Sequence, residues 1–207
     1  MSTSVLAQEP VSSPRDTGTP APVIAPAVSA SGFEWPLPAG WRKETIPFPV
    51  EFAPDIRHRG ILELRFSPGF ADPAAAGFWS YAFVWWLEDE AAPTRQQLTD
   101  ELVRYYFGLS KLVAGDKYAV TIEQFRVDLK DDTAAPPYSA AFQGTIDSFD
   151  AFRTGKPIRL NVKLRVGACA AADRRFVLVE ASPQPMLSSA EPWKALSQVG
   201  SSFTCAP

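Results

Sequence analysis

The sequence contains one histidine, two cysteines and no apolar run of the roughly 18 residues that a membrane-spanning helix needs. One histidine and two cysteines cannot supply the four nitrogen or sulfur ligands of a structural zinc site, so no metal is expected. The formal net charge of −3 gives no electrostatic footprint for nucleic acid. The class of protein that remains is a soluble globular domain, which we expect neither to bind nucleic acid nor to span a membrane.

Sequence motifs for cofactors and nucleophiles are also missing. Neither glycine-rich nucleotide fingerprint occurs, so no cofactor is expected. No G-x-S-x-G nucleophile elbow occurs either. His58 is the only side chain that titrates near pH 7 without a shift. An enzyme would therefore be a small cleft hydrolase in which Glu44 or Glu63 orients His58 as a general base; the alternative is a histidine in an exposed loop.

Composition divides the chain near residue 33. Residues 1–32 contain no aromatic side chain, few charges and many Pro, Ala, Ser and Thr. Such a segment cannot bury enough apolar surface to offset its ordering entropy, so we predict a disordered tail or linker. A proline-rich ligand segment is the alternative. Residues 33–207 have the length of a single domain.

Two features favour export. Val5 and Ala7, followed by Gln8, place small residues at the −3 and −1 positions of a cleavage site, as if the start were misplaced or most of a signal were missing. A disulfide between Cys169 and Cys205 would pin the C-terminus to the sheet and would require an oxidising compartment. The predicted location is periplasmic or secreted. A cytoplasmic protein with two buried thiols is the alternative.

Hydrophobic periodicity predicts an α+β domain with an antiparallel, curved sheet of about six strands. Residues 41–54 carry prolines on one side, so they form an edge strand or an extended arm. One long helix packs on one face of the sheet, and a short C-terminal helix spans about 190–198. The expected strands are 61–66, 78–87, 118–129, 138–148, 157–167 and 175–181.

The long helix is expected over residues 94–114. Thr94 and Gln97 form a capping-box pattern, and Gly115 stands where a helix ends. Apolar residues at alternating spacings of four and three predict one buried stripe, made of Leu98, Leu102, Tyr105, Leu109 and Leu112.

Finer predictions concern the strands. Residues 138–148 and 157–167 read as a hairpin whose paired residue numbers sum to 310, which places Asp147 opposite Lys163. A β-bulge near residues 123–124 would give 118–129 one buried face. Glu63 and Arg65 share the polar side of their strand and are expected to form a surface ion pair.

The best candidate for a binding site is an aromatic face in residues 78–87. Trp79, Tyr81 and Trp85 point the same way in an extended chain, and Trp41 precedes them in the arm. Exposed aromatic rings stack on sugars or on apolar partners. The alternative is that the arm covers this face as core.

The function predicted from sequence is therefore an exported, non-catalytic binding or interaction domain. Its aromatic-lined groove would hold a small apolar, saccharide or peptide ligand at Trp41, Trp79, Tyr81 and Trp85. The alternatives are the hydrolase with His58 and Glu44, and a purely structural or partner-docking protein. The oligomeric state stays open.

Overall fold

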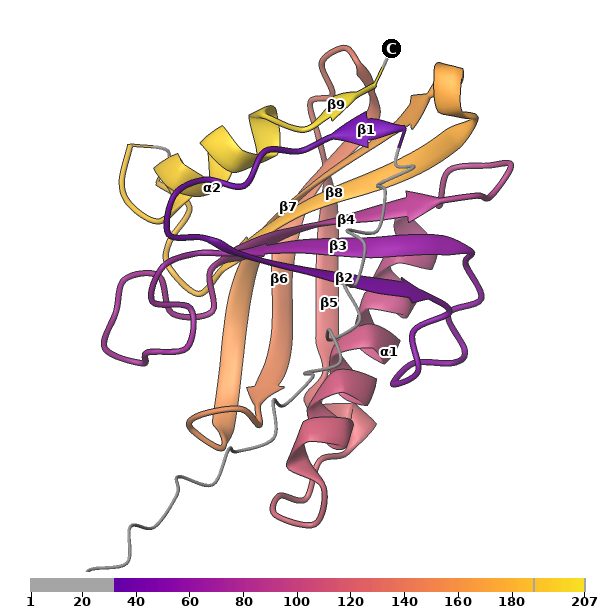
Figure 1. Ribbon diagram of the computed structural model, residues 1–207. Helices are drawn as coiled ribbons and strands as arrows, with labels where there is room; N and C mark the ends of the chain where they lie inside the picture. Colours follow the sequence, from indigo (N-terminus) through magenta and orange to yellow (C-terminus); the bar gives the residue numbers. More distant parts are fainter. Residues whose placement is uncertain (1–31, 188, 207) are drawn as a thin grey trace, which may run out of the picture. The chain divides into compact units, whose positions relative to one another are not determined.

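The computed structural model describes residues 32–187 and 189–206, which form a seven-stranded antiparallel sheet with elements on both faces (Figure 1). Apart from Gly32, the tail expected over 1–32 lies outside the described residues. In spatial order the strands are β2 (Arg42–Phe48), β3 (Gly60–Phe66), β4 (Tyr81–Leu87), β8 (Arg174–Ser182), β7 (Lys156–Cys169), β6 (Tyr138–Asp150) and β5 (Arg126–Asp132). The predicted α+β class is confirmed, and the expected arm is the edge strand β2.

Each face of the sheet has its own covering layer. The long helix α1 (Arg95–Ala114) lies on one face, and α2 (Trp193–Ser201) lies on the other with the paired short strands β1 (Phe33–Glu34) and β9 (Thr204–Cys205) (Figure 1). Neither helix in the described part of the chain combines the length and apolarity needed to cross a membrane.

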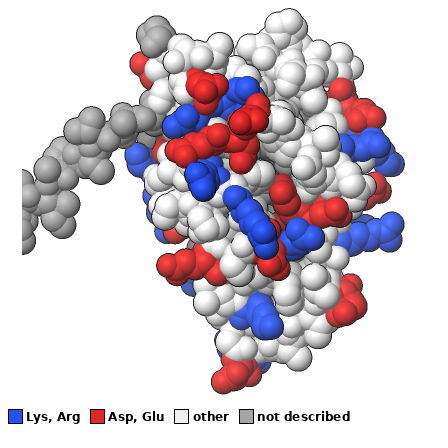
Figure 2. Space-filling view, turned by 90° about the vertical axis from the view of Figure 1, so that its right-hand side faces the viewer, with Lys and Arg blue, Asp and Glu red and all other residues white. Residues whose placement is uncertain are grey.

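Strand β4 shows how one sequence serves both layers. Its side chains alternate between the faces, so Tyr81, Phe83 and Trp85 belong to the core on the α1 side. Ala82 and Val84 belong to the core on the α2 side, where short side chains leave room for the second layer. Most charged side chains are exposed, and Figure 2 shows acidic and basic groups interspersed on the face that it presents. Those that are buried are Glu63, Arg65, Asp150 and Glu180.

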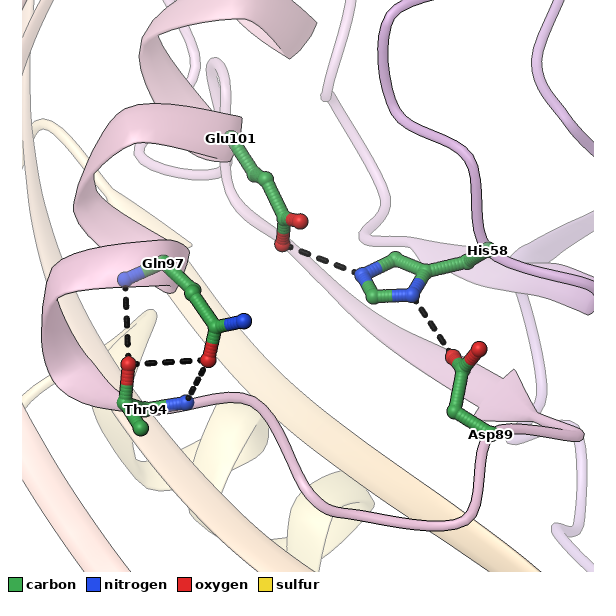
Figure 3. A network of polar contacts seen from close by, with 5 residues as sticks. All are labelled: His58, Asp89, Thr94, Gln97 and Glu101. Atoms are coloured by element: carbon green, nitrogen blue, oxygen red, sulfur yellow. Dashed lines mark hydrogen bonds and ion pairs between the residues drawn. The ribbon is translucent and has the colours of Figure 1, made fainter.

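Helix α1 begins and ends where its sequence predicts. The Thr94 side chain accepts from the backbone N–H of Gln97, and the Gln97 side chain accepts from the N–H of Thr94 (Figure 3). The C-cap is Gly115, with φ of 51°. The predicted stripe is wrong at its last turn, because Leu112 is 65 % exposed and Ser110 is buried instead. The Ser110 hydroxyl donates to the carbonyl of Phe149, which turns this side of the helix toward the sheet.

The β6–β7 hairpin is confirmed, but its predicted register is wrong. Asp147 pairs with Arg159, not with Lys163, so paired numbers sum to 306. The turn sets this register. The buried Asp150 carboxylate accepts from the backbone N–H groups of residues 152, 153 and 154, which centres the turn near residue 153, two residues earlier in the chain than expected.

The chain before β5 also differs from its prediction. Instead of a bulge, a 3-10 turn η1 (Ile122–Gln124) reverses the alternation, and β5 begins at Arg126. The Gln124 side chain accepts from the backbone N–H of Thr121, which stabilises the turn. A second 3-10 turn, η2 (Ala170–Ala172), follows β7.

The predicted disulfide is present. Cys169 ends β7 and is bonded to Cys205 in β9, with 5.5 Å between their Cα atoms. Because β9 pairs with β1, the disulfide ties both terminal strands of the described chain to the main sheet. The C-terminal helix is confirmed as well: Trp193 and Leu196 are buried as expected, although α2 begins after Pro192.

Candidate functional site: a pocket beside the edge strand

A pocket of about 330 Å³ lies between α1 and the half of the sheet formed by β2, β3 and β4. We call it the β2–α1 pocket. Its volume falls at the lower end of the range of about 300–1,000 Å³ that is typical of small-molecule sites. The lining residues are Arg42, Glu44 and Ile46 of β2, Leu64 and Phe66 of β3, Tyr81 of β4, Tyr105 and Leu109 of α1, and Phe52, Phe70, Ala71, Phe152 and Arg153 of three loops.

The position of α1 explains why a cavity forms here. The helix makes its main backbone contacts with β5 and β6, at the opposite edge of the sheet from β2. The β2–β4 half is therefore covered by side chains that reach across from the helix and from loops. Such a cover closes less completely than a helix backbone laid directly on the strands.

Aromatic rings form the floor and rim of the pocket. The rings of Phe66, Phe70 and Tyr81 contact one another, with centroid distances of 4.7 Å for Phe66–Phe70, 5.6 Å for Phe70–Tyr81 and 5.9 Å for Phe66–Tyr81. Phe152, in the β6–β7 turn, is 44 % exposed, and Phe52 lies on the loop after β2. An apolar molecule entering the pocket would therefore exchange water for aromatic carbon.

A few polar groups interrupt this apolar lining. Tyr105 is only 2 % exposed, yet no described residue hydrogen-bonds its hydroxyl. Burial raises the pKa of Tyr105 well above its usual range, and the charges of Tyr106 and Glu44 raise it further, so the hydroxyl keeps its proton at neutral pH. The hydroxyl of Tyr81, in contrast, is hydrogen-bonded to Tyr106.

The structure separates the four aromatic residues predicted as ligand contacts. Tyr81 lines the β2–α1 pocket. Trp79 is buried behind the rim, with its ring 5.8 Å from those of Phe70 and Phe152. Trp85 is fully buried in the α1-side core, and Trp41 belongs to the core on the opposite face.

Most of the polar side chains that line the pocket were not predicted as ligand contacts. Arg42 and Glu44 share strand alternation with Ile46, so their position on the pocket side could have been found from the predicted edge strand. Tyr105 was assigned to the helix stripe alone. No sequence pattern places Phe152 or Arg153 at the pocket, because their position depends on the turn that Asp150 closes.

His58 lies outside the pocket and is held between two carboxylates (Figure 3). Its Nδ1 is 2.6 Å from Asp89 Oδ2, and its Nε2 is 3.0 Å from Glu101 Oε2. Carboxylates only accept hydrogen bonds, so both ring nitrogens must donate and the imidazolium form fits this site. Its partners are therefore Asp89 and Glu101, whereas Glu44, proposed as its orienting group, lines the pocket.

The charge of His58 links three segments: the loop before β3, the end of β4 and helix α1. Burial lowers the pKa of His58, but the hydrogen bonds and charges of Glu101 and Asp89 raise it more, so the net shift is upward. A raised folded-state pKa means that this stabilisation is complete below about pH 6.5, the unfolded value. It is lost as the pH rises through the folded-state pKa.

We expect His58→Gln to lower the free energy of unfolding by about 1.5–3 kcal/mol at pH 6, because glutamine cannot donate to both carboxylates at this geometry or neutralise them. The loss should be smaller at pH 9, because wild-type His58 carries less charge there than at pH 6. Urea unfolding at the two pH values measures the difference. Arg59→Gln, at an exposed neighbouring position, is the matched control. An equal loss at both pH values for His58→Gln would show that the charge of His58 does not stabilise the fold.

Fold and pocket together define a class: an α+β domain with an open antiparallel sheet and a small aromatic pocket beside one edge. Among the described residues, no group of three or more His, Cys, Asp or Glu side chains is placed to hold a metal ion. The sequence matches none of the protein-family models, and it has no significant match among curated proteins.

Proposed function

We propose that this protein is an exported, non-catalytic binding domain that holds a small, largely apolar ligand in the β2–α1 pocket. The observation that carries the proposal is the pocket itself: about 330 Å³, bounded mainly by aromatic and aliphatic side chains, with Tyr81 in its wall. A buried aromatic face without an adjoining cavity would have left only a structural role.

The chemistry of the pocket favours binding over catalysis. A hydrolase needs a base with a free lone pair beside the substrate. His58 has both nitrogens engaged by carboxylates and lies outside the pocket. The tyrosine hydroxyls are held in their protonated form by burial, so they can orient a ligand but are poor bases at neutral pH.

Export is supported by the Cys169–Cys205 disulfide. Structural disulfides persist in oxidising compartments and are rare where thiols are kept reduced. The proposed location is the periplasm or the extracellular space.

We expect the neutral fluorescent probe N-phenyl-1-naphthylamine to bind the full chain saturably at one site. Ala71→Trp places an indole in the pocket wall and should weaken this binding by about tenfold or more, since even about 1.4 kcal/mol of lost contact has that effect. Fluorescence titration of both proteins measures the effect.

Ala76→Trp is the matched control, because Ala76 is exposed on the same loop and does not line the pocket. It should bind the probe as the wild type does, and both variants should keep the wild-type far-ultraviolet circular dichroism, to which one added indole contributes little. If the wild type shows no saturable binding, or if Ala71→Trp binds as tightly as Ala76→Trp, the proposed function is wrong.

A further inference from the structure

The charged residues of the β2–α1 pocket are two arginines and one glutamate. Arg42 comes from β2 and Arg153 from the β6–β7 turn, so residues far apart in the sequence converge on one cavity. No ion pair joins either arginine to a carboxylate anywhere in residues 32–187 or 189–206. Glu44 is the only carboxylate that lines the pocket, which leaves its charged groups with an excess of one positive charge.

The register of the edge strand keeps Arg42 available. Its cross-strand partner in β3 is Phe66, and the guanidinium carbon lies 5.8 Å from the centre of that ring. An aromatic face supports a guanidinium without using its N–H donors. Arg42 is therefore positioned beside the apolar floor while its donors remain free for a ligand.

The neutral donor of the pocket points to the same chemistry. Tyr105 is almost fully buried, lines the cavity and has a protonated hydroxyl that no described residue binds. The hydroxyl is not among the sealed, unpartnered polar atoms of the described residues, so it reaches the cavity, where a ligand oxygen can accept its hydrogen bond in place of water. Two guanidinium groups and one hydroxyl beside an aromatic floor match a molecule with an acidic head and an apolar body.

We infer that the ligand of this pocket is a single-chain amphiphile with an anionic headgroup, a carboxylate or a phosphate monoester. The headgroup pairs with Arg42 and Arg153, and the chain lies against Phe66, Phe70 and Tyr81. This inference rests on the proposed function and adds the chemical class of the ligand. Glu44 weakens the binding of an anion, because its own charge lies in the same cavity.

Displacement of N-phenyl-1-naphthylamine at pH 8 tests the headgroup. Decanoate, decyl phosphate and 1-decanol each have ten carbon atoms and differ in the head. The two anions are used below their micellar concentrations and decanol below its solubility limit. We expect both anions to displace the probe at concentrations about tenfold or more below that of decanol, as charge-assisted hydrogen bonds imply. The order of the two anions identifies the preferred head.

Charge variants locate the headgroup. Arg42→Gln with Arg153→Gln should remove the preference for anions over decanol, which is measured as the ratio of their displacing concentrations so that any change in probe binding cancels. Glu44→Gln should strengthen anion binding severalfold. Lys43→Gln is the matched control, since Lys43 is exposed, adjacent to Arg42 and outside the pocket lining; it should change nothing.

The outcomes separate this inference from the proposed function. If the wild type binds the probe but decanol displaces it as well as the anions do, the anionic headgroup is wrong and the apolar pocket stands. If the double arginine variant keeps the anion preference, the assignment to Arg42 and Arg153 is wrong. If the wild type does not bind the probe at all, the proposed function itself fails.

Discussion

Replacing Arg65 by methionine should lower the free energy of unfolding by about 3–5 kcal/mol, the usual loss when one partner of a buried ion pair is removed. Arg65 is 2 % exposed. Its Nη2 donates to Glu63 Oε1 at 2.6 Å and to the carbonyl oxygen of Trp35 at 2.6 Å. Methionine fills similar volume without these donors, so the Glu63 carboxylate would remain buried without its countercharge. Urea unfolding at pH 7 measures the loss.

A double-mutant cycle separates the charge from the packing. Glu63→Met combined with Arg65→Met removes both charges and should recover most of the stability that Arg65→Met alone loses. Arg42→Met is the matched control, because Arg42 is an exposed arginine on the adjacent strand, and it should change stability by no more than about 0.5 kcal/mol. A double variant less stable than Arg65→Met would show that the stabilisation comes from elsewhere.

The burial of this pair shows where strand alternation stops being informative. Alternation places Glu63 and Arg65 correctly on one side of β3, and the expected ion pair forms, but its predicted surface position is wrong, because a second layer covers that side. Trp35 lies over the guanidinium, 4.4 Å from ring centre to Cζ, and it comes from a segment outside the strand. A polar side of a strand is solvated only if no other part of the chain packs on it.

Glu180 shows the same effect on β8. Its side chain is 1 % exposed and accepts from Arg165 at 2.8 Å. Burial raises the pKa of Glu180 against the lowering effect of Arg165 and Lys163. Helix α2 crosses at Gly200, where a Cβ atom would overlap the carboxylate. Only the packed layers reveal why a glycine stands at that position.

Local signals, in contrast, predicted the elements well. Thr94 and Gln97 fix the start of α1 through contacts within one turn, and Gly115 ends it. Such contacts depend on residues close in sequence, so a pattern is enough to find them. The hairpin was found for the same reason. Its register was missed because the Asp150 turn, not the charge pairing across the strands, sets it.

The candidate site was only half predictable. The aromatic residues of 78–87 were assigned to one face, and Trp79, Tyr81 and Trp85 do share the α1-side core, but Trp79 has a φ of 50°, precedes β4 and does not line the pocket. Tyr81, the first residue of β4, does line the pocket. The cavity also needs loops after β2, after β3 and between β6 and β7. Their meeting is a property of the assembled chain and leaves no periodic pattern.

Loss of the Cys169–Cys205 disulfide should lower the free energy of unfolding by about 4 kcal/mol at most, the chain-entropy estimate for its sequence separation of 36 residues. The bond also holds β9 against the end of β7, so the β1–β9 pair and α2 should loosen first. Cys205→Ser makes the change with little loss of buried volume, because Cys205 is exposed. Guanidinium unfolding without reductant compares the variant with the wild type.

Reductant and thiol counting provide the control. Dithiothreitol should lower the stability of the wild type to that of Cys205→Ser and leave the variant unchanged, since the chain contains no other cysteine pair. Denatured wild-type protein purified from its own compartment should show no free thiol before reduction and two after it. Two free thiols before reduction would contradict the oxidising location that we infer from the bond. Equal stability of the wild type and Cys205→Ser without reductant would contradict its stabilising role.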